Sequence, residues 1–174
     1  MIEILPILCL IAAGVLLITL SIIDFKTYLL PNIYVFPFAV LGIIFHYFTN
    51  FEILTLSEIL TGGFVGYGIL FTIRFLGNKY YGQDSLGLGD VKLLGASGLW
   101  LGLEGVLIAM TVGAFLGLVH GIIYATSISI KNKSKLSLAR LKIPAGPGFI
   151  GGILIAFFWL FHSDILRLFY SVGS

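Results

Sequence analysis

The chain has 174 residues, of which 59% are hydrophobic and only 10% are charged, and its formal net charge at pH 7 is +2. Roughly a quarter of the residues in a soluble domain are charged, so this composition excludes an ordinary soluble domain. A helix needs about 20 mostly apolar residues to cross a bilayer. The sequence therefore predicts an all-α membrane protein, a polytopic bundle of about six transmembrane helices in a single domain, residues 1–174.

Six apolar runs follow one another along the chain. We expect spans at residues 4–23, 33–48, 56–75, 91–103, 105–125 and 148–168. The first run opens with Met1-Ile2-Glu3, an acid where a secretory signal carries positive charge, so we expect a retained helix. The fourth run is short, which indicates either a tilted helix or a first turn that meets water at Asp90.

Basic residues predict the orientation, because Lys and Arg favour the cytoplasmic side of short loops. With both chain ends outside, Arg167 alone lies on the outer face. The cytoplasmic face receives the other basic residues: Lys26, Arg74, Lys79, Lys92, Lys131, Lys133, Lys135, Arg140 and Lys142. It also receives Asp24, Asp84 and Asp90. For the basic segment 131–142 we favour a contact with anionic lipid headgroups over capture of a substrate.

Glycines recur at helical spacing in four places. The pairs and rows are Gly62 with Gly66, Gly98 with Gly102, Gly113 with Gly117 and Gly121, and Gly148 with Gly152. Small residues at this spacing let helix backbones approach closely in lipid. They predict packing inside the bundle, with dimerisation through one row as the alternative.

Cysteine and histidine carry little of the predicted chemistry. The single Cys9 lies in an apolar run, which favours a packing role. The histidines, His46, His120 and His162, are dispersed and have no ligand spacing. For His120 we prefer a buried hydrogen bond to a catalytic role.

The candidate chemistry lies in three segments, of which the first is 24–32. An apolar run ends there in Asp24, and Pro31 starts the next helix, followed by Asn32. An ionisable residue at a membrane helix end is costly, so it indicates function. Taken alone, Asp24 is more simply explained as a solvated boundary residue near Lys26.

The second segment, 84–94, contains Gly87-Leu88-Gly89-Asp90 at the start of a span. We expect Gly87 and Gly89 to adopt backbone angles closed to other residues and to leave space for a peptide strand. The macrodipole also favours an acid at a helix start, by at most about 1 kcal/mol. On the same membrane face as Asp24, this motif predicts two interacting carboxylates.

The third segment, 142–152, combines Pro144 and Pro147 with four glycines at the start of the last run. These residues predict a rigid start to a closely packed helix. We therefore expect this segment to pack against the helices that carry the two aspartates.

In this order and spacing, the segments resemble the type IV prepilin peptidase family, membrane aspartic proteases that share a Gly-x-Gly-Asp motif with presenilin-like and archaeal preflagellin peptidases. The first family motif is matched by Asp24 and Leu30-Pro31-Asn32. The Gly-x-Gly-Asp-x-Lys-Leu-Leu motif is matched by residues 87–94, and the Ile-Pro-x-Gly-Pro motif by residues 143–147. The resemblance implies that Asp24 and Asp90 are catalytic. The residues that it places in support are Gly87, Gly89, Asp84, Lys92, Pro31, Asn32, Pro144, Gly146 and Pro147.

The chain also departs from the family pattern. Asp84 stands where many relatives have glutamate, and Ala145 where phenylalanine is common. Many relatives carry a cytoplasmic domain with two Cys-x-x-Cys pairs, and the longer enzymes N-methylate their product with S-adenosylmethionine. With one cysteine, the chain is expected to be a short form with peptidase activity, as in tight-adherence pili, or a piece of a longer enzyme. Methylation stays an open question.

Two carboxylates brought close together cannot easily both be ionised, so the pair shares a proton. One can activate water while the other polarises the scissile carbonyl, and no metal or cofactor is required. The resemblance implies cleavage after a glycine in class III signal peptides, between a basic leader and an apolar pilin helix. The expected localisation is the cell inner (cytoplasmic) membrane, with the active site facing the cytoplasm.

Expected partners are a prepilin or pseudopilin helix and membrane lipids, with no nucleic acid and with a homo-oligomer left open. Two other functions are compatible with charged helix ends. One is a small transporter or channel with an aspartate ion or proton site. The other is a catalytically inactive scaffold for pilus assembly.

Overall fold

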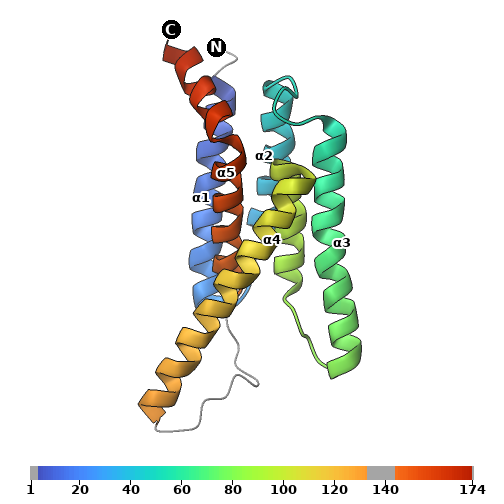
Figure 1. Cartoon of the computed structure of the whole chain (residues 1–174), viewed down its shortest axis with the longest axis vertical. Helices are drawn as coiled ribbons and strands as arrows, with labels where there is room; N and C mark the ends of the chain where they lie inside the picture. Colours follow the sequence, from blue (N-terminus) through green and yellow to red (C-terminus); the bar gives the residue numbers. More distant parts are fainter. Residues whose placement is uncertain (1–3, 133–143, 174) are drawn as a thin grey trace.

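A computed structural model of the chain describes residues 4–132 and 144–173 (Figure 1). The described residues form five helices: α1 (Ile4–Thr27), α2 (Asn32–Phe48), α3 (Leu56–Tyr81), α4 (Leu88–Asn132) and α5 (Gly146–Gly173). Among them, α1, α3, α4 and α5 are long and apolar enough to cross a membrane, and α2 is shorter. The protein is a multi-pass, all-helical membrane protein, as predicted. Lys133, Lys135, Arg140 and Lys142 of the predicted lipid-binding segment lie outside the described residues.

The helix α4 differs from the prediction, which placed two separate spans at 91–103 and 105–125. The structure has one element with a break at Gly102, whose φ of 66° and ψ of −170° are not helical. Figure 1 shows α4 rise to this break and then turn back along the bundle. Glycine tolerates such angles because it has no Cβ. The described residues thus count as five helices, and the two runs predicted here correspond to the two arms of α4 on either side of Gly102. The break between the arms falls at Gly102 rather than before Gly105, a choice that the sequence pattern leaves undecided.

Local sequence signals account for the helix ends. Pro31 occupies the N-cap position of α2, as its fixed φ predicts. The helix α3 begins with a capping box, in which Thr55 and Glu58 satisfy each other's backbone N–H groups. It ends at Gly82, whose left-handed φ of 66° stops the helix and turns the chain toward α4.

Glycines let α4 pack closely against α3 on one side and α5 on the other. A Cβ placed on Gly66 of α3 would lie 2.6 Å from the carbonyl oxygen of Leu94 in α4. A Cβ placed on Gly148 of α5 would lie 3.0 Å from the carbonyl oxygen of Gly113 in α4. The predicted packing role of these glycine rows is confirmed. Dimerisation stays a prediction.

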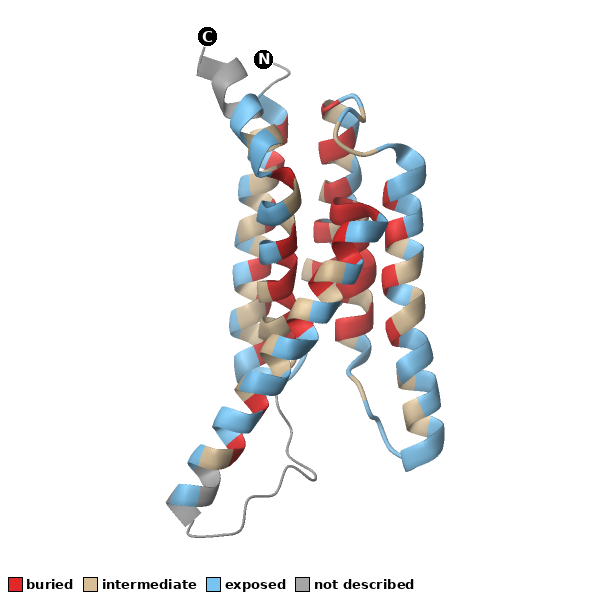
Figure 2. Cartoon of the chain, in the orientation of Figure 1, coloured by how far each residue is buried: buried red, intermediate tan, exposed pale blue. Residues whose placement is uncertain are grey.

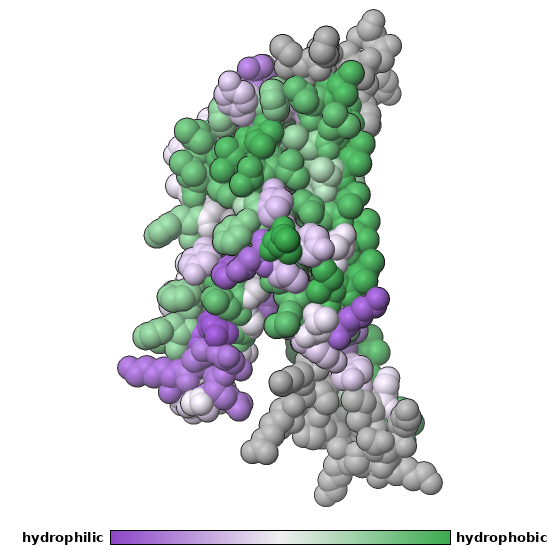
Figure 3. All heavy atoms as spheres, turned by 180° about the vertical axis from the view of Figure 1, so that it is seen from behind, coloured by the Kyte–Doolittle hydropathy of each residue, from purple (hydrophilic) through white to green (hydrophobic). Residues whose placement is uncertain are grey.

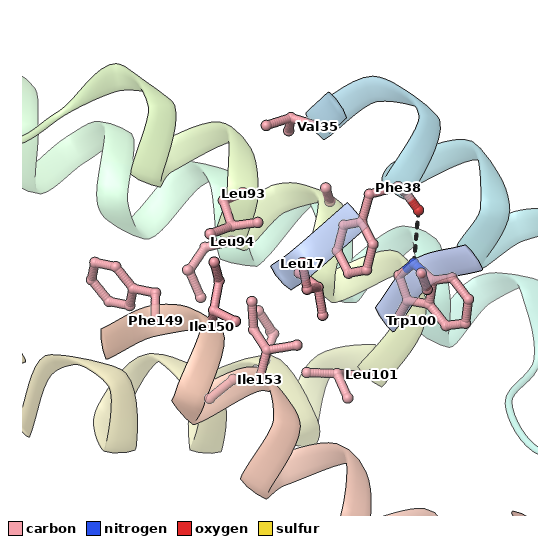
Figure 4. Close-up of a cluster of buried hydrophobic side chains, with 14 of the residues drawn as sticks. Leu17, Val35, Phe38, Leu93, Leu94, Trp100, Leu101, Phe149, Ile150 and Ile153 are labelled. Carbon is pink, nitrogen blue, oxygen red and sulfur yellow. Dashed lines mark hydrogen bonds between the residues drawn. The ribbon is translucent and has the colours of Figure 1, made fainter. Parts of the chain in front are cut away.

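The hydrophobic core lies between the first arm of α4, residues 88–101, and the neighbouring helices. Figure 2 shows buried residues concentrated along this arm, and Figure 4 shows core side chains meeting from several helices. The indole N–H of Trp100 donates to the carbonyl oxygen of Phe38 in α2 at 2.8 Å. His46 is fully buried, with Nε2 3.2 Å from the carbonyl oxygen of Trp100. Cys9 is also buried, as its predicted packing role requires.

One end of the bundle gathers the ends of several helices. The chain runs down α1, up α2 and down α3, and both α4 and α5 start at the lower end (Figure 1). In Figure 3, the surface is mostly apolar, and hydrophilic side chains gather near the lower end of the molecule. The C-terminal end of α1 therefore meets the N-terminal ends of α2, α4 and α5.

Candidate active site

Asp24 lies in the last turn of α1 and is only 4% exposed. Its Oδ2 accepts a hydrogen bond from the backbone N–H of Gly146, the first residue of α5, at 3.0 Å. A Cβ placed on Gly146 would lie 2.7 Å from the same oxygen, so glycine lets the start of α5 close onto the carboxylate. The N-terminal end of a helix favours a negative charge. The N-terminal end of α5 thus supplies Asp24 with both a hydrogen-bond donor and a favourable helix dipole.

Asp90 lies in the first turn of α4 and is 8% exposed. Its carboxylate folds back over Gly87, where an added Cβ would lie 2.6 Å from Oδ2. The turn that carries Asp90 packs on the connection that follows Asp24, because a Cβ placed on Gly89 would lie 2.8 Å from the Cβ of Leu30. The structure therefore brings together the two aspartates that the sequence singled out.

One of the two predicted reasons for the glycines beside Asp90, their special backbone angles, is wrong. Among the described glycines, only Gly82 and Gly102 have positive φ, so Gly87 and Gly89 do not use glycine-only angles. Close approach explains them instead. A Cβ placed on Gly89 would lie 2.8 Å from the Cβ of Leu30, a buried residue between α1 and α2. The place of a side chain is thus taken by Leu30 at Gly89 and by the Asp90 carboxylate at Gly87. The space for a peptide strand stays a prediction.

Asn32 and Lys92, both predicted as supporting residues, contact each other. Lys92 Nζ donates to Asn32 Oδ1 at 3.1 Å. Asn32 is the first residue of α2, directly after its N-cap Pro31, and Lys92 follows Asp90 by two positions in α4. The pair ties the start of α2 to the helix turn that carries Asp90.

Asp84 lies in the connection between α3 and α4 and, unlike Asp24 and Asp90, is exposed. Its side chain is 75% exposed, and its Oδ1 lies 2.6 Å from Arg74 Nη2 and 3.0 Å from Asn78 Nδ2 of α3. Sequence reasoning missed Arg74 and Asn78 as partners. A charged residue inside an apolar helix was the available signal, because its cost demands a nearby partner. From the sequence, Arg74 contributes only to the predicted orientation.

The third segment begins α5 as predicted. Pro144 is buried just before the helix, Pro147 is half-buried in its first turn, and Gly148 packs on α4. Ile143, which belongs to the same motif, lies outside the described residues. The hydrogen bond from Gly146 to Asp24 goes beyond the packing role that the sequence favoured.

His120 lies on α4 beside the end of α1. Its ring is half-buried and meets the ring of Phe25 edge-on, with centroids 5.9 Å apart. Phe25 directly follows Asp24, so the imidazole is near the site without a hydrogen bond among the described residues. Within residues 4–132 and 144–173, no three His, Cys, Asp or Glu side chains form a group that could hold a metal ion.

Comparison with known proteins gives the family. The sequence model of the type IV leader peptidase family matches residues 11–122, a stretch that contains both Asp24 and Asp90. The chain belongs to the type IV leader peptidase family. This confirms the resemblance drawn from the three sequence segments.

Several curated relatives of this family member are prepilin leader peptidase/N-methyltransferases. The relative from Xanthomonas campestris pv. campestris is 31% identical over 143 residues, covering 82% of this chain and 47% of the relative. The one from Vibrio cholerae is 30% identical over 143 residues, with coverages of 82% and 52%. The one from Escherichia coli is 31% identical over 106 residues, with coverages of 61% and 46%. The chain spans about half the length of these relatives, and no solved structure matches it significantly.

Proposed function

We propose that this type IV leader peptidase family member is an aspartic endopeptidase that removes the basic leader from type IV prepilin-like substrates. The observation that carries the proposal is the convergence of two buried carboxylates, Asp24 and Asp90, at one end of the bundle. Family membership supports the same reaction, because the curated relatives are prepilin leader peptidases by name. The proposal covers cleavage of the leader and does not extend to methyl transfer.

Catalysis would use the proton that the two carboxylates share. The ionised carboxylate takes a proton from water as the water oxygen attacks the scissile carbonyl carbon. The protonated carboxylate polarises the carbonyl oxygen and then donates to the leaving amine as the C–N bond breaks. Because the titration belongs to the pair, neither Asp24 nor Asp90 is assigned as the base.

The proposed substrate has a peptide bond at the junction between a basic leader and an apolar pilin or pseudopilin helix. Membership of the family supports cleavage after a glycine. Both aspartates lie near helix ends, which supports action on a bond just outside the apolar segment of the substrate.

We further propose that the site faces the cytoplasm in the inner (cytoplasmic) membrane. The described basic residues Lys26, Arg74, Lys79 and Lys92 belong to the end of the bundle that carries the aspartates, whereas Glu52, Glu104 and Asp164 belong to the opposite half. This distribution follows the positive-inside rule. In this topology the two arms of α4 on either side of Gly102 cross separately, which gives six crossings.

A cleavage assay tests the function. The purified protein in liposomes is incubated with a synthetic prepilin peptide that contains a basic leader, a glycine and the first turns of an apolar helix. We expect two products whose masses place the cut directly after the glycine. If the peptide stays intact after long incubation and ions cross the membrane of the same liposomes, the transporter function would be favoured instead.

Cysteine labelling tests the orientation in a Cys9→Ser background. Gln83→Cys lies in the connection between α3 and α4, and Glu52→Cys lies in the connection between α2 and α3. We expect an impermeant thiol reagent added outside the cell to label position 52 and to spare position 83. The reverse pattern would invert the proposed topology.

A further inference from the structure

The connection between α3 and α4, residues 82–87, is held against α3 by a set of polar contacts. After Gly82 the chain returns along the last turns of α3 before it enters α4 (Figure 1). Asn78 Oδ1 accepts the backbone N–H of Ser85 at 2.7 Å and its hydroxyl at 3.0 Å. A Cβ placed on Gly77 would overlap the Ser85 hydroxyl, so glycine makes room for the returning chain.

Arg74 connects two points of this segment. Its Nη2 lies 2.6 Å from Asp84 Oδ1, and its Nη1 donates to the carbonyl oxygen of Leu86. The Arg74 side chain is only 19% exposed, whereas that of Asp84 is 75% exposed. An exposed ion pair alone contributes little. The planar guanidinium, however, can hold a carboxylate and a carbonyl at fixed relative positions, which an ammonium group cannot do.

The segment that Arg74 holds leads directly to the Asp90 carboxylate. One peptide bond joins Leu86, whose carbonyl accepts from Arg74, to Gly87. Gly87 is the residue over which Asp90 Oδ2 folds, and its carbonyl accepts the N–H of Val91 at 3.4 Å. A shift at Leu86 therefore moves the surface on which the carboxylate rests.

We infer that Arg74 is a positioning residue for Asp90, acting through the Leu86 carbonyl and Asp84 and not through contact with the substrate. This inference rests on the proposed function. This role explains a partially buried arginine in a helix that is apolar enough to cross a membrane, since charged residues inside membrane spans are costly without a partner. It also gives Asp84 a role distinct from that of Asp24 and Asp90.

Two kinds of measurement test the inference, on the full chain in lipid nanodiscs. Hydrogen exchange of segment 83–90 reports on the contacts themselves and needs no substrate. Cleavage kinetics with the synthetic prepilin peptide report on Asp90. The variants are Arg74→Met, which loses both contacts, Arg74→Lys, which keeps the charge, and Asp84→Asn, which keeps an acceptor oxygen. Lys79→Met is the matched control, because it removes an exposed positive charge from the same end of α3.

We expect Arg74→Met to speed exchange in segment 83–90 and to lower kcat by about tenfold to a hundredfold, the range that a misplacement of about 1 Å produces. KM should change by less than about twofold, because substrate binding is not touched. Arg74→Lys and Asp84→Asn should fall between this variant and the parent. Lys79→Met should match the parent in both measurements.

Several outcomes would overturn the inference. Unchanged exchange in Arg74→Met would show that Arg74 does not hold segment 83–90 in place. Faster exchange with an unchanged kcat would show that holding this segment does not position Asp90. A rise in KM at constant kcat would mean that Arg74 binds substrate. If Arg74→Met does not fold, Arg74→Lys and Asp84→Asn with parental exchange and kcat would overturn the inference by themselves. A parent protein that never cleaves prepilin would refute the proposed function, and the exchange data would still show whether the contacts exist.

Discussion

Asp24 lies at the C-terminal end of its helix, whereas Asp90 lies in the first turn of its own. A helix disfavours a negative charge at its C-terminal end and favours one at its N-terminal end. Asp24 therefore depends on a second helix, because the N–H of Gly146 from the start of α5 donates to its carboxylate. Asp90 is supported by its own helix start and by the segment directly before it.

The difference indicates which parts of the chain each carboxylate depends on. The position of Asp90 follows from a continuous stretch, from Arg74 to the first turn of α4. The hydrogen-bond donor to Asp24 comes instead from α5, far along the chain, so this contact depends on the packing of α5 against α1. The two halves of the candidate site should thus respond differently to changes in their surroundings, although the proposed reaction uses both.

The largest effect is expected from removing either carboxylate. Asp24→Asn and Asp90→Asn should each lower kcat by at least about a thousandfold, since residues that act as a unit fail together. Each variant should insert and fold, because asparagine has nearly the same shape as aspartate. Peptide cleavage and thermal unfolding in the same detergent check both points. Full processing by either variant would rule out the shared-proton mechanism.

Gly89→Leu tests the contact where the two halves of the site meet. A Cβ at this position would lie 2.8 Å from the Cβ of Leu30, so a larger side chain should push Leu30 and the start of α4 apart. We expect loss of cleavage with both carboxylates still present, and a milder loss for Gly89→Ala. The same kinetic assay measures both variants. A stable leucine variant with the parental rate would show that this contact does not position Asp90.

Gly146→Ala and Gly87→Ala compare the two carboxylates directly. An added methyl group would lie 2.7 Å from Asp24 Oδ2 in the first variant and 2.6 Å from Asp90 Oδ2 in the second. Both should lower kcat by about tenfold to a hundredfold, because each displaces a reacting oxygen.

Only Gly146→Ala should also lower the melting temperature, since it separates α5 from α1. Gly68→Ala is the control, because a Cβ there has no neighbour within 4 Å. Equal melting temperatures for Gly146→Ala and Gly87→Ala would contradict the difference drawn between Asp24 and Asp90.

The smallest effect is expected at the pair formed by Asn32 and Lys92. Their hydrogen bond is exposed and 3.1 Å long, so its loss should cost about 0.5–1 kcal/mol. Lys92→Met should therefore lower kcat less than about fivefold, a change that parallel kinetics with Asn32→Ala should reproduce. A loss as large as that of Asp90→Asn would instead place Lys92 in the reaction.

The sequence predicted the features that depend on local chemistry. Asp24 and Asp90 were recognisable as charges at the ends of apolar runs, and Pro31 as a helix start. The contact of Gly146 with Asp24 and the contact of Leu30 with Gly89 were not predictable, because they join segments whose packing no local pattern encodes. The break at Gly102 could not be distinguished from one at Gly105, since both glycines interrupt the same apolar run.

The two shortest helical pieces of the bundle lie next to each other. The first arm of α4, residues 88–101, is about 20 Å long at 1.5 Å per residue, and the 17 residues of α2 reach about 25 Å. Both fall short of the roughly 30 Å hydrocarbon thickness of a bilayer. The hydrogen bond between Trp100 and Phe38 joins these two pieces. Hydrophobic mismatch should therefore thin the membrane beside α2, so the acyl chain length of the surrounding lipid becomes a determinant of how readily water and a leader peptide reach Asp90.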